Sequence, residues 1–419
     1  MRFVHCADVH LDSPMRGLEA YEAAPVGELK GATRRAFENT VNLCCSEGAA
    51  FLVIAGDLFD GNWRDFNTGL FFVKQMARLR DAGVKVFLVR GNHDAQSRIT
   101  KRLPLPDNVV EFPAAAPATK RLDDLGVAVH GCSFARPDTS DNLAARYPPP
   151  VPGYLNIGVL HTALNGREGH EPYAPCTRDE LIARGYDYWA LGHVHQREVV
   201  CEQPPIVFPG NLQARHIREA GAKGCTLVTV EDGRVTALEH RVVDVARWVL
   251  ISVDAGTADT PDEVLTLVRD ALRAEAVAAE GRLVAVRVRV QGRSPAHDAL
   301  MRQEGQWVQD VRATAADVGF ETIWVEKVEL ATRSPRLDDA RRRPDDALAQ
   351  LLQVADALRA DPEAAAALLQ PQWKDLVSRL PPEAQHGDAA IKPEEPQHLD
   401  RLIERAVDVI AGRLMPPAD

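Results

Sequence analysis

The chain has 419 residues, enough for two or three domains, and its 45% hydrophobic and 26% charged content is typical of a globular protein. The formal net charge of -11 argues against a protein that coats nucleic acid by bulk electrostatics, because such binding depends on lysines and arginines that displace counterions from phosphate. A nucleic acid substrate would have to be held by local basic patches, metal ions or a partner protein.

The sequence predicts neither a targeting segment nor a membrane span. Asp8, His10 and Asp12 stand where a secretory signal needs apolar residues, and no run of eighteen apolar residues occurs. The seven cysteines are scattered without a C-x-x-C pair, which predicts neither a disulfide framework nor a structural zinc site. We therefore expect a cytoplasmic protein that does not associate with membranes.

Residues 2 to about 242 alternate short apolar runs with segments of helical period, the pattern of an α/β domain. Helices are predicted over 28–48 and 66–82, and Thr177 with Glu180 forms a capping box that predicts a third helix. The predicted strands cover residues 2–6, 50–56, 84–91, 127–132, 157–161, 186–192, 205–209 and 225–230.

Two further parts of the chain are predicted after residue 245. Thr260 and Pro261 mark a helix start, as N-cap and first helical residue, within a small α+β domain. That domain is predicted to contain strands over 248–253, 283–290 and 321–330 and a second helix over 297–318. The last part is rich in Arg, Asp, Pro and Ala, with amphipathic helices predicted over 345–359 and 398–414. The predicted parts are therefore residues 1–245, 246–331 and 332–419.

Five short polar motifs occur at the ends of predicted strands. Residues i and i+2 of an extended chain point to the same side, so each pair of the form ligand-x-ligand can reach one metal cluster. The donors are carboxylate, imidazole and amide oxygen without thiolate, which suits Mn²⁺, Fe²⁺ or Zn²⁺. Asp57, at the end of the apolar run FLVIAGD, is the expected bridge between two cations. The motifs are Asp8-x-His10, Gly56-Asp57, Gly91-Asn92-His93-Asp94, His161 and Gly192-His193-x-His195.

These five motifs in this order resemble those of the calcineurin-type metallophosphoesterase superfamily, and within it the SbcD-like nuclease subunits of DNA-repair complexes. The segments HCADVHLDSP, GYDYWALGHVHQRE and PPIVFPGNLQARHIRE are most similar to YhaO-type DNA repair exonucleases. The resemblance covers about residues 1–245. It implies an α/β fold: a metallophosphoesterase β-sandwich flanked by helices, followed by a small α+β capping domain and a helical C-terminal segment.

Carried over residue by residue, the resemblance implies a site with two divalent metal ions. His93 is expected to stay off the metals and to act as general acid or stabilise the phosphorane, with Asp94 orienting its ring. The implied reaction is in-line attack of a metal-activated hydroxide on phosphorus, with Mn²⁺ as the expected metal and Fe²⁺, Mg²⁺ or Zn²⁺ as alternatives. The implied ligands are Asp8, His10 and His195 for one metal, Asn92, His161 and His193 for the other, and Asp57 for both.

The metal motifs alone do not name the substrate, because relatives with the same core act on different phosphoesters. Gly61 stands where protein phosphatases of the superfamily have arginine, and Asp94 where they have glutamate, so both favour the nuclease branch. Arg215 and His216 are predicted to contact phosphates of the substrate. A second basic cluster consists of Arg98, Lys101 and Arg102, although scattered arginines more often pair with carboxylates on the surface.

The leading hypothesis is a Mn²⁺-dependent DNA repair exonuclease that works with an SMC-like coiled-coil ATPase. Family architecture implies that the C-terminal helices bind this partner, and packing of these helices on the protein's own domains is an equal alternative. Kinship also implies a homodimer. The rival functions are a phosphatase or phosphodiesterase acting on small nucleotides and a non-catalytic scaffold that docks an ATPase. The complete set of motif residues argues against the scaffold.

Overall fold

The chain divides into two compact units. Unit 1 comprises Met1–Leu250, Val277–Val286 and Glu321–Glu326, and unit 2 comprises Ile251–Ala276, Arg287–Phe320 and Lys327–Asp419. The fold is that of a computed structural model, which describes residues 1–13, 25–60, 66–96, 104–165, 173–319, 322–335, 347–379 and 396–414.

The first large sheet of unit 1 has the strand order β12-β11-β1-β2-β3-β4. Strands β1 to β4 are parallel, and β11 is antiparallel to both of its neighbours. Helices α2 (Ala32–Ser46) and α3 (Phe66–Asp81) bury Phe37, Phe72 and Met76 in a core shared with β2. The strands are β1 (Arg2–Cys6), β2 (Phe51–Ala55), β3 (Lys85–Val89), β4 (Val109–Glu111), β11 (Gly224–Glu231) and β12 (Arg234–Val242).

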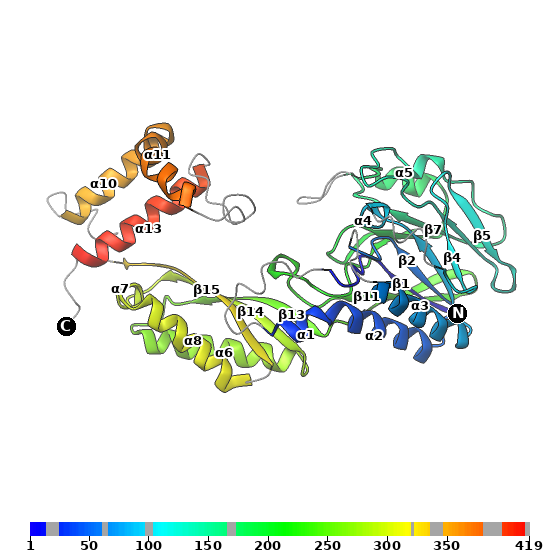
Figure 1. The fold of residues 1–419 in the computed structure, drawn as a ribbon, viewed down its shortest axis with the longest axis horizontal. Helices are drawn as coiled ribbons and strands as arrows, with labels where there is room; N and C mark the ends of the chain where they lie inside the picture. The colour runs from blue at the N-terminus through cyan, green and yellow to red at the C-terminus, as the bar shows by residue number, and fades with distance from the viewer. Residues whose placement is uncertain are drawn as a thin grey trace. The chain divides into compact units, whose positions relative to one another are not determined.

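The second large sheet has the strand order β5-β6-β7-β8-β10-β9, with antiparallel strands only at its edges. Its inner face packs on the first sheet through a core that includes Phe3, Phe51 and Tyr188. Helix α5 (Arg178–Ala183) lies against its outer face and begins with the predicted capping box (Figure 1). The strands are β5 (Ala118–Leu122), β6 (Val127–Gly131), β7 (Leu155–His161), β8 (Tyr188–Gly192), β9 (Glu198–Glu202) and β10 (Pro205–Phe208).

The two sheets approach each other closely at Gly192. A Cβ atom there would lie 2.0 Å from the carbonyl oxygen of Ala55, so only glycine fits. A buried polar bridge crosses the same interface: His5 Nδ1 lies 2.9 Å from the Tyr188 hydroxyl, and His5 Nε2 lies 3.1 Å from the Leu191 carbonyl oxygen. The carboxyl ends of β1, β2 and β3 and those of β7 and β8 therefore meet at one edge of the sandwich.

A third, three-stranded sheet has the order β13-β14-β15. At its start, the Trp248 and Trp324 rings pack edge to face with centroids 5.9 Å apart. As predicted, the Glu263 amide donates to the Thr260 hydroxyl at the start of α6. The elements are β13 (Ala246–Asp254), α6 (Pro261–Ala278), β14 (Leu283–Arg293), α7 (His297–Arg302), α8 (Glu304–Gly319) and β15 (Ile323–Arg333).

The last described helices, within unit 2, are α10 (Ala347–Ala360), α11 (Pro362–Arg379) and α13 (Pro396–Leu414). They share an apolar core that includes Leu352 and Ile403 and enclose a groove of about 430 Å³ lined almost entirely by apolar side chains. None of the helices in the described ranges combines the length and apolarity needed to cross a membrane. Two large sheets flanked by helices, a small α+β part and C-terminal helices confirm the predicted fold class.

Candidate metal centre

Four of the seven predicted ligands have unusual backbone geometry. Asp8, His10, Asp57 and His193 all have positive φ, with values of 50°, 46°, 49° and 102°. Non-glycine residues adopt this region rarely, and such strained residues cluster at functional sites. Each turn directs a polar side chain back over the end of its strand, so the strained backbone is what gathers these side chains at one edge of the sandwich.

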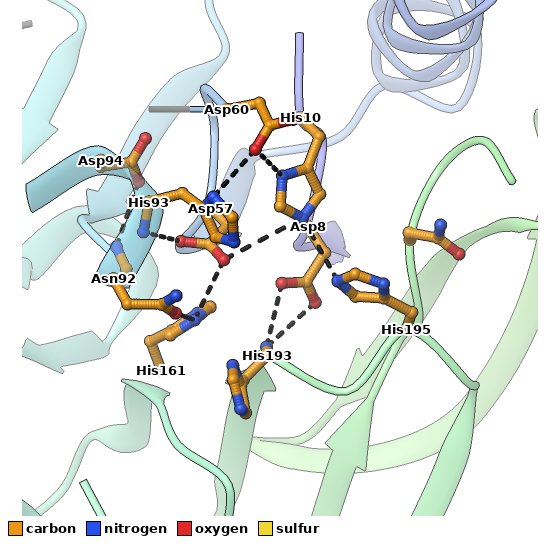
Figure 2. Close-up of polar contacts among 12 residues, drawn as sticks. Asp8, His10, Asp57, Asp60, Asn92, His93, Asp94, His161, His193 and His195 are labelled. Atoms are coloured by element: carbon orange, nitrogen blue, oxygen red, sulfur yellow. Dashed lines mark hydrogen bonds and ion pairs between the residues drawn. The ribbon is translucent and has the colours of Figure 1, made fainter. Parts of the chain in front are cut away.

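The first group of candidate ligands contains residues that follow strands of both sheets. One ligand atom each from Asp8, His10 and His195 lies within 4.8 Å of the others. His10 Nε2 and His195 Nε2 are 3.2 Å apart, and the Asp8 carboxylate accepts the His193 backbone amide at 3.0 and 3.1 Å. Burial raises the pKa of Asp8 and lowers that of His10. Figure 2 shows the side chains converging on the same point.

The second group lies beside the first. Ligand atoms of Asp57, His161 and His193 meet the same 4.8 Å limit, and His161 Nε2 lies 3.5 Å from Asp57 Oδ2 and 3.0 Å from Asn92 Oδ1. His161 Nδ1 is 2.9 Å from the Ala55 carbonyl oxygen, so this nitrogen donates and Nε2 is left as a ligand. Asp57 Oδ2 is also 4.0 Å from His10 Nε2, so one carboxylate oxygen faces both groups.

The donor set fits two divalent cations. Asp8 and Asp57 are each about 1% exposed, and burying carboxylates is costly unless cations compensate them. The negative charge of these two carboxylates also affects the pKa of His161. Burial opposes protonation of its imidazole, but Asp57 and Asp8 outweigh burial and raise the pKa of His161 to about 9. Imidazole, carboxylate and amide oxygen suit divalent transition metals, and a shared carboxylate is what a two-metal site needs. The structure therefore brings all seven predicted ligands together around a position suited to positive charge.

His93 is held by a residue that the sequence did not single out. Its Nδ1 lies 2.8 Å from Asp60 Oδ1, and its backbone amide donates to Asp57 Oδ1 at 3.0 Å. The Asp60–His93 hydrogen bond is visible in Figure 2. Ser13 Oγ donates to the other Asp60 oxygen at 2.6 Å. The signal was present in the segment Asp57-Leu-Phe-Asp60, where the second carboxylate follows the bridging one by three residues.

The prediction that Asp94 orients the His93 ring is wrong. The Asp94 carboxylate accepts backbone amides of Leu58, Phe59 and Gly91 at 3.1, 2.9 and 3.1 Å. Because Asn92 begins the short helix α4 (Asn92–Gln96), adjacent side chains point in different directions, and Asp94 points under the turn that carries Asp57. Burial, and then the charge of Asp57, raises the pKa of Asp94 to about 7. Asp94 thus anchors the turn after β2.

His195 is held in the same way by Glu219, also missed from the sequence. His195 Nδ1 lies 2.7 Å from Glu219 Oε1, and Glu219 Oε2 accepts from Asn211 Nδ2 at 3.0 Å.

The two predicted substrate contacts differ in exposure. The Arg215 side chain is 16% exposed and packs beside the Glu219 carboxylate, whereas the His216 side chain is 53% exposed. The remaining predicted basic cluster and the glycine after Asp60 lie outside the described residues: Arg98, Lys101, Arg102 and Gly61.

Comparison with known proteins agrees with this geometry. Residues 1–197 match the family described as Calcineurin-like phosphoesterase, and residues 248–333 match the middle domain of Metallophosphoesterase YhaO. Metallophosphoesterase YhaO of Bacillus subtilis (strain 168) is 36% identical over 299 residues, which cover 70% of this chain and 72% of that protein. The chain belongs to the calcineurin-like metallophosphoesterases. The predicted kinship is confirmed, and the protein is a metal-dependent phosphoesterase.

More distant relatives of this metallophosphoesterase are described as DNA double-strand break repair protein Mre11. The protein of that name from Methanopyrus kandleri is 27% identical over 274 residues, covering 59% of this chain and 58% of the relative. Among solved structures, a dimetal phosphatase from Danio rerio aligns with a TM-score of 0.35 and 11% identity, over 55% of this chain and 93% of that chain.

Proposed function

We propose that this metallophosphoesterase is a Mn²⁺-dependent DNA repair exonuclease. The observation that carries the proposal is the pair of adjacent ligand groups, Asp8 with His10 and His195 and Asp57 with His161 and His193, facing a common carboxylate oxygen. When bound, two divalent ions lower the pKa of water and offset charge on phosphate oxygens. This donor geometry requires no covalent intermediate on the protein.

The chain's own residues supply orientation and a proton. Asp57 would hold both ions, while Asn92 and His161 complete the second set of ligands. His93 is 35% exposed, which lets its Nε2 reach an ester oxygen, and Asp60 fixes the ring through Nδ1. We assign His93 the role of donating a proton or hydrogen bond to the departing oxygen. The exposed His216 is the proposed contact for a flanking phosphate.

The choice of DNA as substrate is supported by the relatives named as double-strand break repair proteins. It is also supported by Gly61 and Asp94, which stand where the protein phosphatases have arginine and glutamate.

For the region 246–331 we propose the capping role that restricts access to the site. For an SMC-like coiled-coil ATPase we propose the apolar groove of α10, α11 and α13 as the docking site. A homodimer would use α3, whose Phe66 and Leu70 side chains are exposed in the described chain.

The test incubates the purified full chain and Mn²⁺ with end-labelled duplex and single-stranded DNA, cyclic nucleotides and bis(p-nitrophenyl) phosphate. The expected result is release of nucleotides from DNA that stops when the metal is chelated. His93→Ala should keep its bound metal while hydrolysis falls by about 10²- to 10⁴-fold. Rapid turnover of small esters with intact DNA, both alone and with a coiled-coil ATPase, would instead assign the site to small phosphoesters.

A further inference from the structure

Arg215 contacts both carboxylates that lie behind the histidines of the site. Its Nη2 donates to Glu219 Oε1 at 3.1 Å, and its Nη1 lies 3.8 Å from Asp60 Oδ2. Its backbone amide donates to Glu219 Oε2 at 2.7 Å. One guanidinium thus joins residues that belong to separate strand-end segments of unit 1.

Each of these carboxylates holds one imidazole of the site. Asp60 Oδ1 lies 2.8 Å from Nδ1 of His93, and Glu219 Oε1 lies 2.7 Å from Nδ1 of His195. A carboxylate on Nδ1 fixes both the ring orientation and the tautomer, which leaves Nε2 to do the chemistry. The planar fork of arginine presents Nη1 to one carboxylate and Nη2 to the other, whereas lysine would have to serve both from a single nitrogen.

The same contacts argue against Arg215 as a phosphate-binding side chain. Both terminal nitrogens face protein groups: Nη2 faces Glu219, and Nη1 also lies 3.4 Å from the Ser13 hydroxyl. The Nε atom is buried without a hydrogen-bond partner among the described residues. The guanidinium charge is already compensated by two carboxylates of the protein, so less of it is left to attract a phosphate.

We propose, resting on the two-metal hydrolysis proposed above, that Arg215 is a positioning residue that ties His93 and His195 into one network. Through Glu219 it sets the orientation of a metal ligand, and through Asp60 it sets the orientation of the proton donor. Removing the guanidinium leaves two neighbouring carboxylates without their shared cation, so both imidazoles lose their fixed orientation. A single substitution therefore affects metal binding and leaving-group protonation together.

The experiment compares wild type with Arg215→Met and Arg215→Lys, and uses Arg218→Met as the matched control. The control removes a positive charge from an exposed position of the same segment. Mn²⁺ affinity is measured by calorimetry without substrate, and folding is checked by thermal unfolding of each variant. Hydrolysis is measured on the p-nitrophenyl and phenyl esters of thymidine 5′-monophosphate, because the poorer leaving group depends more on a proton donor.

Both Arg215 variants are expected to bind Mn²⁺ about tenfold to a hundredfold more weakly, the range typical of lost partners behind a metal ligand. The phenyl ester should lose more activity than the p-nitrophenyl ester, and Arg218→Met should match wild type in both measurements. If Arg215→Met unfolds, the Lys variant carries the test, because lysine keeps the positive charge that a phosphate contact needs but loses the two-nitrogen fork that faces both carboxylates.

A folded Arg215→Lys that binds Mn²⁺ within about twofold of wild type and keeps the wild-type ratio of the two ester rates would overturn the bridge. A rise in KM for DNA with a weaker salt dependence, and no change in metal affinity, would assign Arg215 to the phosphate backbone instead. Failure of the two-metal proposal looks different, because the wild-type protein itself would then take up no Mn²⁺.

Discussion

Replacing Asp60 by asparagine tests how much the orientation of His93 contributes to hydrolysis. Asparagine keeps the shape of Asp60 but removes the charge that faces His93 Nδ1 at 2.8 Å. A hydrogen bond to a charged group contributes roughly 1.5–3 kcal/mol. At about 1.4 kcal/mol for each tenfold change in rate, Asp60→Asn should reduce kcat by roughly 10- to 150-fold.

The pH dependence of kcat should shift in a definite direction in the Asp60→Asn variant. Burial disfavours protonated His93, but the hydrogen bond to Asp60 and the charge of Asp57 outweigh burial, so the pKa of His93 is raised. Activity that needs protonated His93 is present below this pKa and is lost as the pH rises through it. Asp60→Asn removes the main stabiliser of the protonated form and should therefore move this loss of activity to lower pH.

The assay is kcat on the phenyl ester of thymidine 5′-monophosphate, measured from about pH 5 to about pH 9 at saturating Mn²⁺. Asp179→Asn is the matched control, since that carboxylate is 84% exposed and lies on α5. An Asp60→Asn protein with wild-type kcat and an unmoved pH profile, while its Mn²⁺ affinity is intact, would show that His93 does not act through Asp60.

Three further predictions concern stability. Asp94→Asn should lower the free energy of unfolding by about 1–3 kcal/mol in urea titrations, because an amide cannot accept from all three backbone donors. Gly192→Ala should lower it by at least about 1–3 kcal/mol through its clash with Ala55, whereas Gly27→Ala, with open space around it, should not. Burial, and then Glu404, raises the pKa of Asp408 to about 6, so its contribution to stability is full below about pH 3.8 and is lost as the pH rises through 6. Asp408→Asn should therefore stabilise unit 2 at pH 7, by about 1 kcal/mol once solvent screening of this partly exposed carboxyl is allowed for, in thermal unfolding.

The apolar strands of the two large sheets were predicted within one or two residues, because complete burial forces an uninterrupted apolar run, whereas the predicted ends of β14 and β15 are three residues short. The run predicted over 50–56 forms Phe51–Ala55, with all five side chains buried. The four edge strands of the two large sheets were missed, since backbone pairing with a neighbour, not complete side-chain burial, makes them strands: β4, β5, β9 and β12. The helix predicted over 28–48 is two helices, α1 (Val26–Lys30) and α2, separated at Gly31.

The site residues could be predicted where they directly follow a strand. They could not be predicted where the conformation of a turn determines which side chains meet. Asp8 and His10 were found because they follow the apolar run of β1 within four residues, although the structure places both on a turn with positive φ and not in the extended chain that the sequence argument assumed. Glu219 reaches His195 only because a particular turn returns the chain to the site, which no local pattern encodes, whereas Asp60 was signalled by its place three residues after Asp57. Asp94 was misassigned because adjacency in sequence was taken for contact, although its carboxylate points to the amides of another turn.

The metal centre depends on how the two large sheets pack, because each candidate ion draws ligands from both. Asp8 and His10 follow β1, whereas His195 follows β8 of the other sheet. The sheets are fixed at this edge by the close approach of Gly192 to Ala55 and by the buried His5 bridge to β8. A displacement between the sheets would therefore separate ligands of one ion. Conversely, ions that bind only the folded sandwich must stabilise it, so packing and metal affinity should change together in variants of this interface.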